Sequence, residues 1–400
     1  MDTAPAYNQS MLRDRYLTGA VFEDLQEKMV FVGGARQVGK TTFAFDLLGK
    51  RFRSPAYFNW DNRRDRREIM AARWPGDADL IILDEIHKLR GWKTLVKGEY
   101  DKLKSRYKFM VTGSARLDTI RRGGDSLQGR YHYYRLHPFS LGELSGTSGA
   151  VETFKEIPLA RESPASDFDS LFEFGGFPEP LFRQNAKFLR RWHNEKIERM
   201  FRDDITSVEQ VRELGRMKLL SDMLPERVGS LFSANAVRED LEVSHRAVSN
   251  WLMILESFYY HFRIPPFESR WIRSIKKEPK LYVWDWSEVP DQGARFENLV
   301  AGHLLKLCHF LYDRDGVRAD LFFLRDVEKR EADFLVTVER KPWFAVEAKL
   351  AEETVSPSLL YFKNKLKIPF AYQLIKKRAV HKLDRGVHVV SAGRFLAGLV

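Results

Sequence analysis

One stretch near the N-terminus decides the fold class: residues 29–48 read MVFVGGARQVGKTTFAFDLL. An apolar run is followed by the pattern G-x-x-x-x-G-K-[ST] and then by an amphipathic helical pattern. In such a unit, N–H groups of the loop and the N-terminus of the helix surround phosphate groups. The alternative is a glycine turn that only tightens a strand-to-helix corner. We expect a nucleotide to be held by Gly34, Val38, Gly39, Lys40, Thr41 and Thr42.

A second apolar run supplies the carboxylates that the phosphate loop lacks. Leu80–Leu83 is followed directly by Asp84 and Glu85. Lys40 should reach the β and γ phosphates, and Mg²⁺ should be bound by the Thr41 hydroxyl together with Asp84. Glu85 would then orient and deprotonate the attacking water. The pair of motifs predicts hydrolysis, with ATP and Mg²⁺ as cofactors.

Two further residues are candidates for the same reaction. Ser114 follows the strand-like run Tyr107–Thr112, where it could touch the γ phosphate or the water, or else cap the following helix. Arg130 directly precedes the run Tyr131–Leu136. We expect it to reach the nucleotide of a neighbouring subunit, because charge develops on the transferred phosphoryl group. An ordinary surface arginine is the competing interpretation.

Length and composition limit the class of protein. The chain has 400 residues, of which 44% are hydrophobic and 30% charged, so a disordered or fibrous protein is excluded and two or three domains are expected. The longest apolar runs are too short to cross a bilayer, and we expect a soluble, cytoplasmic protein without a membrane partner. The single cysteine, Cys308, excludes a disulfide framework and a cysteine-based zinc site. The formal net charge of +11 favours a polyanionic partner such as DNA.

The residue pattern changes twice along the chain. Residues 1–150 alternate apolar runs with helical patterns, which is typical of an α/β core with a parallel sheet. Residues 151–290 form the expected middle part, in which helical periodicity dominates from Phe168 to about Glu256. Residues 291–400 combine helices with strands and predict a third, α/β domain; the elements expected there include a helix at Glu297–Leu311 and strands at Ala332–Thr337, Trp343–Leu350 and Phe370–Ile375.

A helix-turn-helix is expected in the middle part. Ala234–Asp240 and Ser244–Glu256 show helical patterns with one shared apolar face, and Ser244 is a suitable N-cap. Phe258–Phe262 and Leu281–Trp286 could form the strands of a wing, with a basic stretch between them. A lid or packing module is the alternative. The residues expected to contact DNA are Ser244, His245, Arg246, Ser249, Asn250, Lys276 and Lys277.

Carboxylates near the C-terminus suggest a nuclease-like centre. Glu347 and Lys349 share one face of an alternating strand, Asp333 lies near the start of the preceding strand, and Glu297 begins a helix. Two carboxylates for Mg²⁺ and a lysine beside the water are the groups that such nucleases use. A five-residue loop, 338–342, would set Asp333 opposite Glu347, whereas a four-residue loop would turn them to opposite faces. A structural salt bridge of Lys349 is the alternative.

Several of these motifs together resemble a known family. GARQVGKT, LDEIHKL, VTGSARL, LQGR followed by HPFSLGEL, and FGGFPEPLF look like a prokaryotic group of AAA-superfamily ATPases. The resemblance implies a P-loop AAA-type core, a helical lid with a winged helix, and a C-terminal domain related to restriction-endonuclease-like nucleases. We take the GGFPE stretch, residues 175–179, as a glycine-rich turn between core and lid.

These features predict an ATP- and Mg²⁺-dependent ATPase that acts on DNA, with an active or relict nuclease domain. It should work as a homo-oligomer, for example a ring. The alternative is a nucleotide-controlled switch or scaffold that binds DNA or protein and neither remodels nor cuts DNA.

Overall fold

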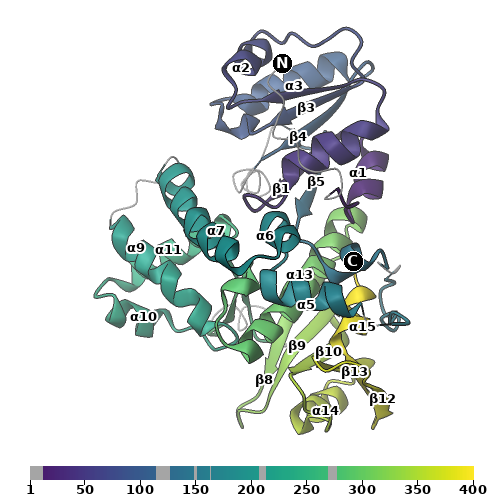
Figure 1. The fold of residues 1–400 in the computed structure, drawn as a ribbon, viewed down its shortest axis with the longest axis vertical. Coiled ribbons are helices and arrows are strands. Elements are labelled where there is room, and N and C mark those ends of the chain that lie inside the picture. The colour runs from purple at the N-terminus through teal and green to yellow at the C-terminus, as the bar shows by residue number, and fades with distance from the viewer. Residues whose placement is uncertain (1–11, 114–126, 148–150, 163, 207–212, 269–276) are drawn as a thin grey trace. The chain divides into compact units, whose positions relative to one another are not determined.

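The structure is a computed structural model, and it describes residues 12–113, 127–147, 151–162, 164–206, 213–268 and 277–400. It contains two compact units, residues 1–138 and 139–400, and each is described by itself (Figure 1). Among the described residues, no helix combines the length and the apolar character needed to cross a membrane.

A parallel sheet forms the core of the first unit. Its strand order is β2-β3-β4-β1-β5, and all the neighbouring strands run parallel. Each strand lies where an apolar run predicts it, which confirms the α/β class. The strands are β1 (Met29–Gly34), β2 (Pro55–Asn59), β3 (Leu80–Asp84), β4 (Lys108–Thr112) and β5 (Tyr131–Leu136).

The connections of the first unit place polar residues at the carboxyl edge of this sheet. After β1 the chain turns through the phosphate loop and becomes helical at Lys40, continuing as a π-helix (Thr42–Leu48) and a short 3-10 turn (Gly49–Arg51). A Cβ at Gly34 would lie 2.5 Å from the carbonyl oxygen of Leu136, so this position needs glycine. The other helices are α1 (Thr18–Asp24), α2 (Arg63–Met70) and α3 (Trp92–Leu103), with a 3-10 turn at Ile86–Lys88.

The second unit begins with helices, as the periodicity predicts. A two-stranded antiparallel sheet of β6 (His261–Ile264) and β7 (Lys280–Val283) follows them. These strands are displaced from the expected runs, because residues 258–260 close the preceding helix and Trp286 begins a 3-10 turn, η8 (Trp286–Glu288). The helical elements are α4 (Leu141–Ser145), α5 (Ala165–Phe174), α6 (Pro178–Arg183), α7 (Ala186–Arg199), η6 (Met200–Ile205), α9 (Leu214–Met223), η7 (Leu224–Arg227), α10 (Ala234–Asp240) and α11 (His245–Ser257).

A six-stranded mixed sheet forms the C-terminal part of the second unit, in the order β12-β13-β11-β10-β9-β8. The long helix α13 (Gln292–Asp315) packs along β8, β9 and β10 (Figure 1). The buried Cys308 lies in this helix, as expected for a core thiol. The strands are β8 (Ala319–Arg325), β9 (Glu331–Val338), β10 (Lys341–Lys349), β11 (Phe370–Ile375), β12 (His381–Asp384) and β13 (Val387–Ser391), and the remaining helices are α14 (Pro357–Lys365) and α15 (Ala392–Ala397).

The connection between β9 and β10 differs from the expected five-residue loop. It is a tight turn at Glu339 and Arg340, both with positive φ, because Lys341 already pairs with Val338. Continued without change, this register would put Asp333 opposite Val346. A β-bulge between Pro342 and Phe344 shifts the pairing by one residue, so that Val346 pairs with Phe334. Continued by one position, this register sets Glu347 opposite Asp333. The bulge therefore produces the pairing that was expected from a five-residue loop.

Residues 155–160 pack against the C-terminal sheet, although they belong to the expected middle part, 151–290. The backbone carbonyl of Lys155 accepts a hydrogen bond from Trp343 Nε1 (2.8 Å), and the N–H of Ile157 donates to the Tyr372 hydroxyl (2.9 Å). Ala160 exchanges hydrogen bonds with Arg394 at 2.9 and 2.8 Å. The carbonyl oxygen of Pro158 would lie 1.6 Å from a Cβ at Gly398, so this strip of chain packs against Gly398 without room for a side chain there.

Candidate functional site

The phosphate loop in the first unit carries a buried lysine. Lys40 Nζ donates to the backbone carbonyls of Gly34 (3.0 Å) and Ala35 (2.8 Å), at the start of the loop. The loop is supported from below by Arg15, whose Nη1 donates to the carbonyl of Val38 at 3.2 Å. The ammonium group is therefore held at the loop, where a phosphate would need it.

Asp84 is the centre of the hydrogen bonds beside the loop. Its side chain is buried, and Oδ2 accepts from the hydroxyls of Thr41 (2.7 Å) and Tyr57 (2.7 Å). The other oxygen, Oδ1, accepts from Thr112 Oγ1 at 2.5 Å. Burial and the charge of Asp84 raise the pKa of Tyr57, so its hydroxyl stays protonated and remains a donor. Hydroxyl and carboxylate oxygens are the ligands that Mg²⁺ prefers, and this donor set fits that ion.

Glu85 follows Asp84 in a left-handed backbone conformation with φ of 56°. Its Oε2 lies 3.2 Å from Lys88 Nζ and 3.6 Å from His87 Nε2. Lys88 Nζ also contacts Asp61 Oδ2 at 2.5 Å. The carboxylate expected to activate water is thus partly engaged by the Lys88 ammonium group, with the His87 ring nearby, on the turn that follows it.

Of the two remaining catalytic candidates, the structure describes only Arg130. Ser114 lies outside the described residues. Arg130 immediately precedes β5, and its Nε donates to Asp101 Oδ1 of α3 at 2.8 Å. The phosphate loop follows the carboxyl end of β1, whereas Arg130 lies at the amino end of β5, which runs parallel to β1. Within its own chain, Arg130 therefore does not join the nucleotide site.

The candidate DNA-contacting face is formed by α11. Ser244 caps the helix by accepting from the N–H of Ala247 (3.1 Å), as predicted. His245, Arg246 and Asn250 are exposed, and Ser249, half-buried, contacts His245 Nδ1 at 3.4 Å. Lys276 lies outside the described residues, and Lys277 is ion-paired with Glu268. The structure thus presents polar and basic side chains on one surface of the helix pair.

The structure brings the C-terminal carboxylates together. The N–H of Asp333 donates to Glu347 Oε2 (3.4 Å), and the N–H of Ala348 donates to Asp333 Oδ2 (2.9 Å). Lys349 Nζ lies 2.9 Å from Glu347 Oε1. Glu297 on α13 joins them through a residue that the sequence did not indicate: Lys280 of β7, whose Nζ lies 3.1 Å from Glu297 Oε1 and 3.7 Å from Asp333 Oδ1.

Crowding of carboxylates changes their acidity. Burial, together with the charge of Asp333, raises the pKa of Glu297 to about 7. The same two causes raise the pKa of Glu347 to about 7. One more carboxylate, Glu331, contacts Lys280 Nζ at 2.7 Å and Arg325 Nη1 at 2.8 Å. Four carboxylates therefore share three cationic side chains.

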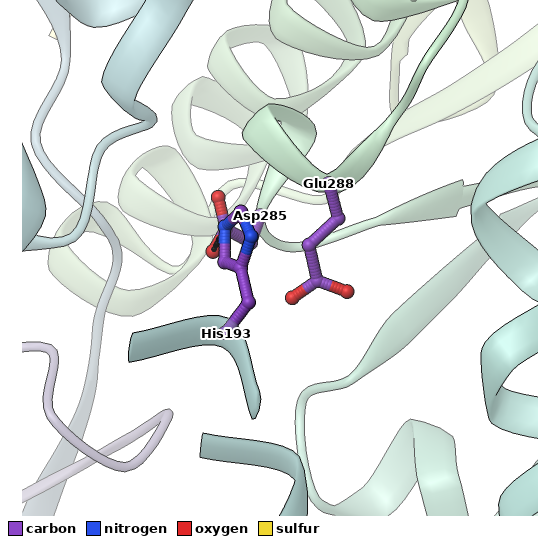
Figure 2. A group of neighbouring side chains, drawn as sticks. All are labelled: His193, Asp285 and Glu288. Carbon is purple, nitrogen blue, oxygen red and sulfur yellow. Dashed lines mark ion pairs between the residues drawn. The ribbon is translucent and has the colours of Figure 1, made fainter. Parts of the chain in front are cut away.

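A second group of ligating side chains lies between α7 and η8. Figure 2 shows His193, Asp285 and Glu288, whose ligand atoms all lie within 4.8 Å of one another. Lys196 Nζ lies 2.9 Å from Asp285 Oδ2 and also contacts Glu288 Oε1. One ammonium group already pairs with both carboxylates, so this group is a buried ion-pair network and does not fit a metal ion.

The GGFPE stretch, residues 175–179, packs against this ion-pair network. It joins α5 to α6 within the second unit, and Gly175 has a φ of 75°. A Cβ at Gly175 would lie 2.6 Å from Asp285 Oδ1, and the ring of Phe177 lies beneath Lys196 Nζ, 5.1 Å from centroid to nitrogen. The glycine and the aromatic ring therefore serve the packing of the ion pairs.

Three contributors were missed at the sequence level. Tyr57 and Arg15 lie outside any motif, and Lys280 was assigned only to a basic stretch. A signal existed for Tyr57, because β2 leads to the same sheet edge as β3. No sequence signal marked Arg15 or the role of Lys280, since their partners lie far away in the chain.

Three families match successive parts of the chain. Residues 26–145 match an AAA domain, residues 165–287 match a domain of unknown function, DUF8612, and residues 292–395 match another, DUF4143. The chain thus carries an AAA domain followed by two domains of unknown function.

The chain is also similar to two relatives and to two solved structures. The chain is 22% identical to the uncharacterized protein MJ1544 of Methanocaldococcus jannaschii, over 86% of this chain and 80% of the relative. It is 22% identical to the uncharacterized protein Rv2008c of Mycobacterium tuberculosis, over 79% of this chain and 69% of the relative. The RuvB Holliday junction branch migration motor of Thermotoga maritima aligns with a TM-score of 0.30 and 17% identity over 65% of this chain and 93% of that chain. Bacteroides Pif1 bound to ssDNA aligns with a TM-score of 0.22 and 14% identity over 40% of this chain and 56% of that chain.

Proposed function

We propose that this protein binds ATP with Mg²⁺ at the phosphate loop, hydrolyses it, and acts on DNA as a homo-oligomer. The observation that carries the proposal is the 2.7 Å contact between the Thr41 hydroxyl and Asp84 Oδ2. It joins the two motifs that ATP chemistry needs, since one supplies the phosphate loop and the other the metal carboxylate. The match of residues 26–145 to an AAA domain supports the same reading.

Each residue has a role in this proposal. Lys40 and the loop N–H groups bind the β and γ phosphates, and Thr41 and Asp84 hold Mg²⁺. When bound, the metal neutralises charge that develops on the phosphates. Glu85 orients the attacking water and accepts its proton, which favours hydrolysis over transfer to another substrate.

The place of Arg130 supports the proposal of a homo-oligomer. This arginine lies at the end of the sheet opposite to its own phosphate loop. An arginine that stabilises the transferred phosphoryl group would therefore have to act on the nucleotide of another copy. A ring is the closed arrangement in which every copy can both give and receive such a residue.

DNA is the proposed partner on the grounds of charge and of the exposed face of α11. The net charge of +11 favours a polyanion, and His245, Arg246 and Asn250 are residue types that contact phosphates and base edges.

For the C-terminal domain we propose the relict version of the nuclease-like centre.

One measurement tests the function directly. ATP hydrolysis by the full chain is measured with Mg²⁺ alone and then with single-stranded, duplex or branched DNA. We expect turnover that at least one form of DNA stimulates. The absence of turnover would reject the ATPase, and turnover that is indifferent to every DNA would reject the coupling to DNA.

A nucleotide-controlled switch is the second candidate. The observation that favours it is the engagement of Glu85 by Lys88 at 3.2 Å, with His87 at 3.6 Å. A general base paired with an ammonium group is less available to accept a proton, so turnover would be slow. Slow turnover that DNA does not change, together with DNA binding that depends on the nucleotide, would favour the switch.

A further inference from the structure

A lysine from outside the C-terminal sheet lies inside its carboxylate cluster. Lys280 belongs to β7, and its side chain is only 3% exposed. Its Nζ contacts Glu331 Oε1 at 2.7 Å and Glu297 Oε1 at 3.1 Å, and lies 3.7 Å from Asp333 Oδ1. One ammonium group thus faces three carboxylates, which is the arrangement expected around a cation.

Other groups of the chain also engage these carboxylates. Tyr282 donates at 2.7 Å to Glu297 Oε1, the oxygen that Lys280 contacts as well, and Arg325 pairs with Glu331 Oε2 at 2.8 Å. Asp333 Oδ2 accepts from the N–H of Ala348 at 2.9 Å. A divalent ion would need several of these oxygens as ligands at about 2.0–2.6 Å. It would then lie beside the ammonium group, and the two positive charges would repel each other.

We propose that Lys280 Nζ and a divalent cation are alternative occupants of this cluster, and that the folded chain contains the lysine. The donor set Glu297, Asp333 and Glu347 has the chemistry of a metal site, yet the place of the metal is taken. The cluster consequently joins the hairpin of β6 and β7 to the C-terminal sheet, and it supports no metal-dependent cleavage. This inference does not rest on the proposed ATPase function, since it concerns other residues.

The burial of Lys280 favours a cluster that holds either the lysine or a divalent cation over a cluster that holds both. A buried ammonium ion is stable only when it is paired, and here three carboxylates provide the pairing. Removing the lysine leaves these carboxylates without their central cation, and a divalent ion becomes the natural replacement. Lys349 does not take this place in its present contacts, because its Nζ pairs with Glu347 Oε1 at 2.9 Å, a carboxylate that Lys280 does not contact.

The test measures Mn²⁺ binding to the full chain without nucleotide, by electron paramagnetic resonance. All proteins carry Asp84→Asn, which removes the carboxylate proposed to bind the metal in the nucleotide site. The protein with this change alone is the reference. It is compared with three variants that add Lys280→Met, Lys280→Met together with Asp333→Asn, or Lys277→Met as a control. Lys277 is a surface lysine three positions away, ion-paired with Glu268.

We expect Lys280→Met to gain one bound Mn²⁺ per chain, at least about tenfold tighter than any site in the reference, and to lose it again with Asp333→Asn. Since a ligand stabilises the state that binds it, Mn²⁺ should raise the Tm of Lys280→Met and leave the reference and Lys277→Met unchanged. If Lys280→Met is unfolded without metal, Mn²⁺ should restore a cooperative unfolding transition.

Three results would overturn the proposal. The first is a Mn²⁺ ion in the reference protein that Asp333→Asn removes, because lysine and metal would then coexist. The second is a folded Lys280→Met protein that binds no Mn²⁺. The third is an unfolded Lys280→Met protein that Mn²⁺ does not restore.

Discussion

The hydroxyl of Tyr57 and the hydroxyl of Thr41 donate to the same oxygen, Oδ2 of Asp84, each at 2.7 Å. Tyr57 comes from β2, the edge strand beside β3. Asp84, the carboxylate proposed to hold Mg²⁺, is therefore oriented by a residue that no nucleotide-binding motif contains. Changing a group that orients a metal ligand typically costs about 10–100-fold in metal affinity or activity.

Tyr57→Phe keeps the ring and removes only the donor. We expect the Mg²⁺ concentration for half-maximal ATP turnover to rise by roughly tenfold, because Asp84 loses one of the groups that fix its orientation. ATP turnover measured as a function of Mg²⁺ checks this. Phe45→Leu is a suitable control, since Phe45 packs near Tyr57 and carries no hydrogen-bonding group. An unchanged Mg²⁺ dependence would show that Thr41 and Thr112 suffice.

Lys40 and Glu85 should separate nucleotide binding from hydrolysis. Lys40→Ala is expected to abolish ATP binding or turnover, because it removes the cation that reaches the β and γ phosphates. Glu85→Gln is expected to keep ATP binding and lose turnover, because only the group that accepts a proton from water is changed. Calorimetric ATP binding and phosphate release measure the two steps. Full turnover in both variants would remove the assignment of this site.

Arg130 should act across a subunit interface. Arg130→Ala is expected to lower turnover by about a thousandfold without weakening ATP binding. Mixing it with Glu85→Gln should restore some activity, since mixed assemblies contain sites with one intact copy of each residue. Asp101→Asn is the control, because it removes the ion partner and leaves the arginine in place. A fully active monomer would refute the interface.

The exposed face of α11 should contribute to DNA affinity. Arg246→Ala combined with Lys277→Ala is expected to weaken DNA binding and to flatten its salt dependence by about one slope unit for each lost phosphate contact. Fluorescence anisotropy at several salt concentrations gives both values. Arg238→Ala, on the preceding helix α10, tests whether any exposed arginine has the same effect. An equal salt slope in the double variant and the reference would assign the helix pair to packing.

His303 should make the second unit sensitive to acid. Its Nε2 accepts from the N–H of Leu141 at 3.0 Å and its Nδ1 donates to the carbonyl of Leu299 at 2.8 Å, so the neutral ring is fully bonded. Burial lowers the pKa of His303 to about 4. Below the usual pKa of about 6.5 the unfolded chain takes up a proton that the folded chain does not, so the folded state loses stability as the pH falls towards 4.

The matching experiment compares the wild-type protein with His303→Gln. Between pH 7 and pH 5 the contribution of this histidine amounts to about 2 kcal/mol of unfolding free energy. Urea unfolding at both pH values should therefore show a smaller loss for His303→Gln than for the wild type. Equal losses in the two proteins would mean that the histidine is protonated in the folded chain.

Local patterns allowed most of the fold to be predicted. The five strands of the first unit lie at runs that the sequence pattern predicts as strands, and the phosphate loop and Asp84 lie in motifs that sequence spacing defines. What could not be predicted depends on contacts between distant residues. The bulge between Pro342 and Phe344 and the docking of Lys280 are decided by packing in three dimensions, and no local pattern encodes them.

The strip of residues 155–160 makes the C-terminal sheet a discontinuous folding unit. Trp343 and Tyr372 on neighbouring strands each complete a hydrogen bond with this strip, and Arg394 closes it at Ala160. A fragment that began at α13 would expose two large aromatic side chains and leave their polar atoms without these partners. The helical segments between the strip and α13 are therefore an insertion within the C-terminal fold, and the strip and the sheet should become protected from hydrogen exchange in the same step of folding.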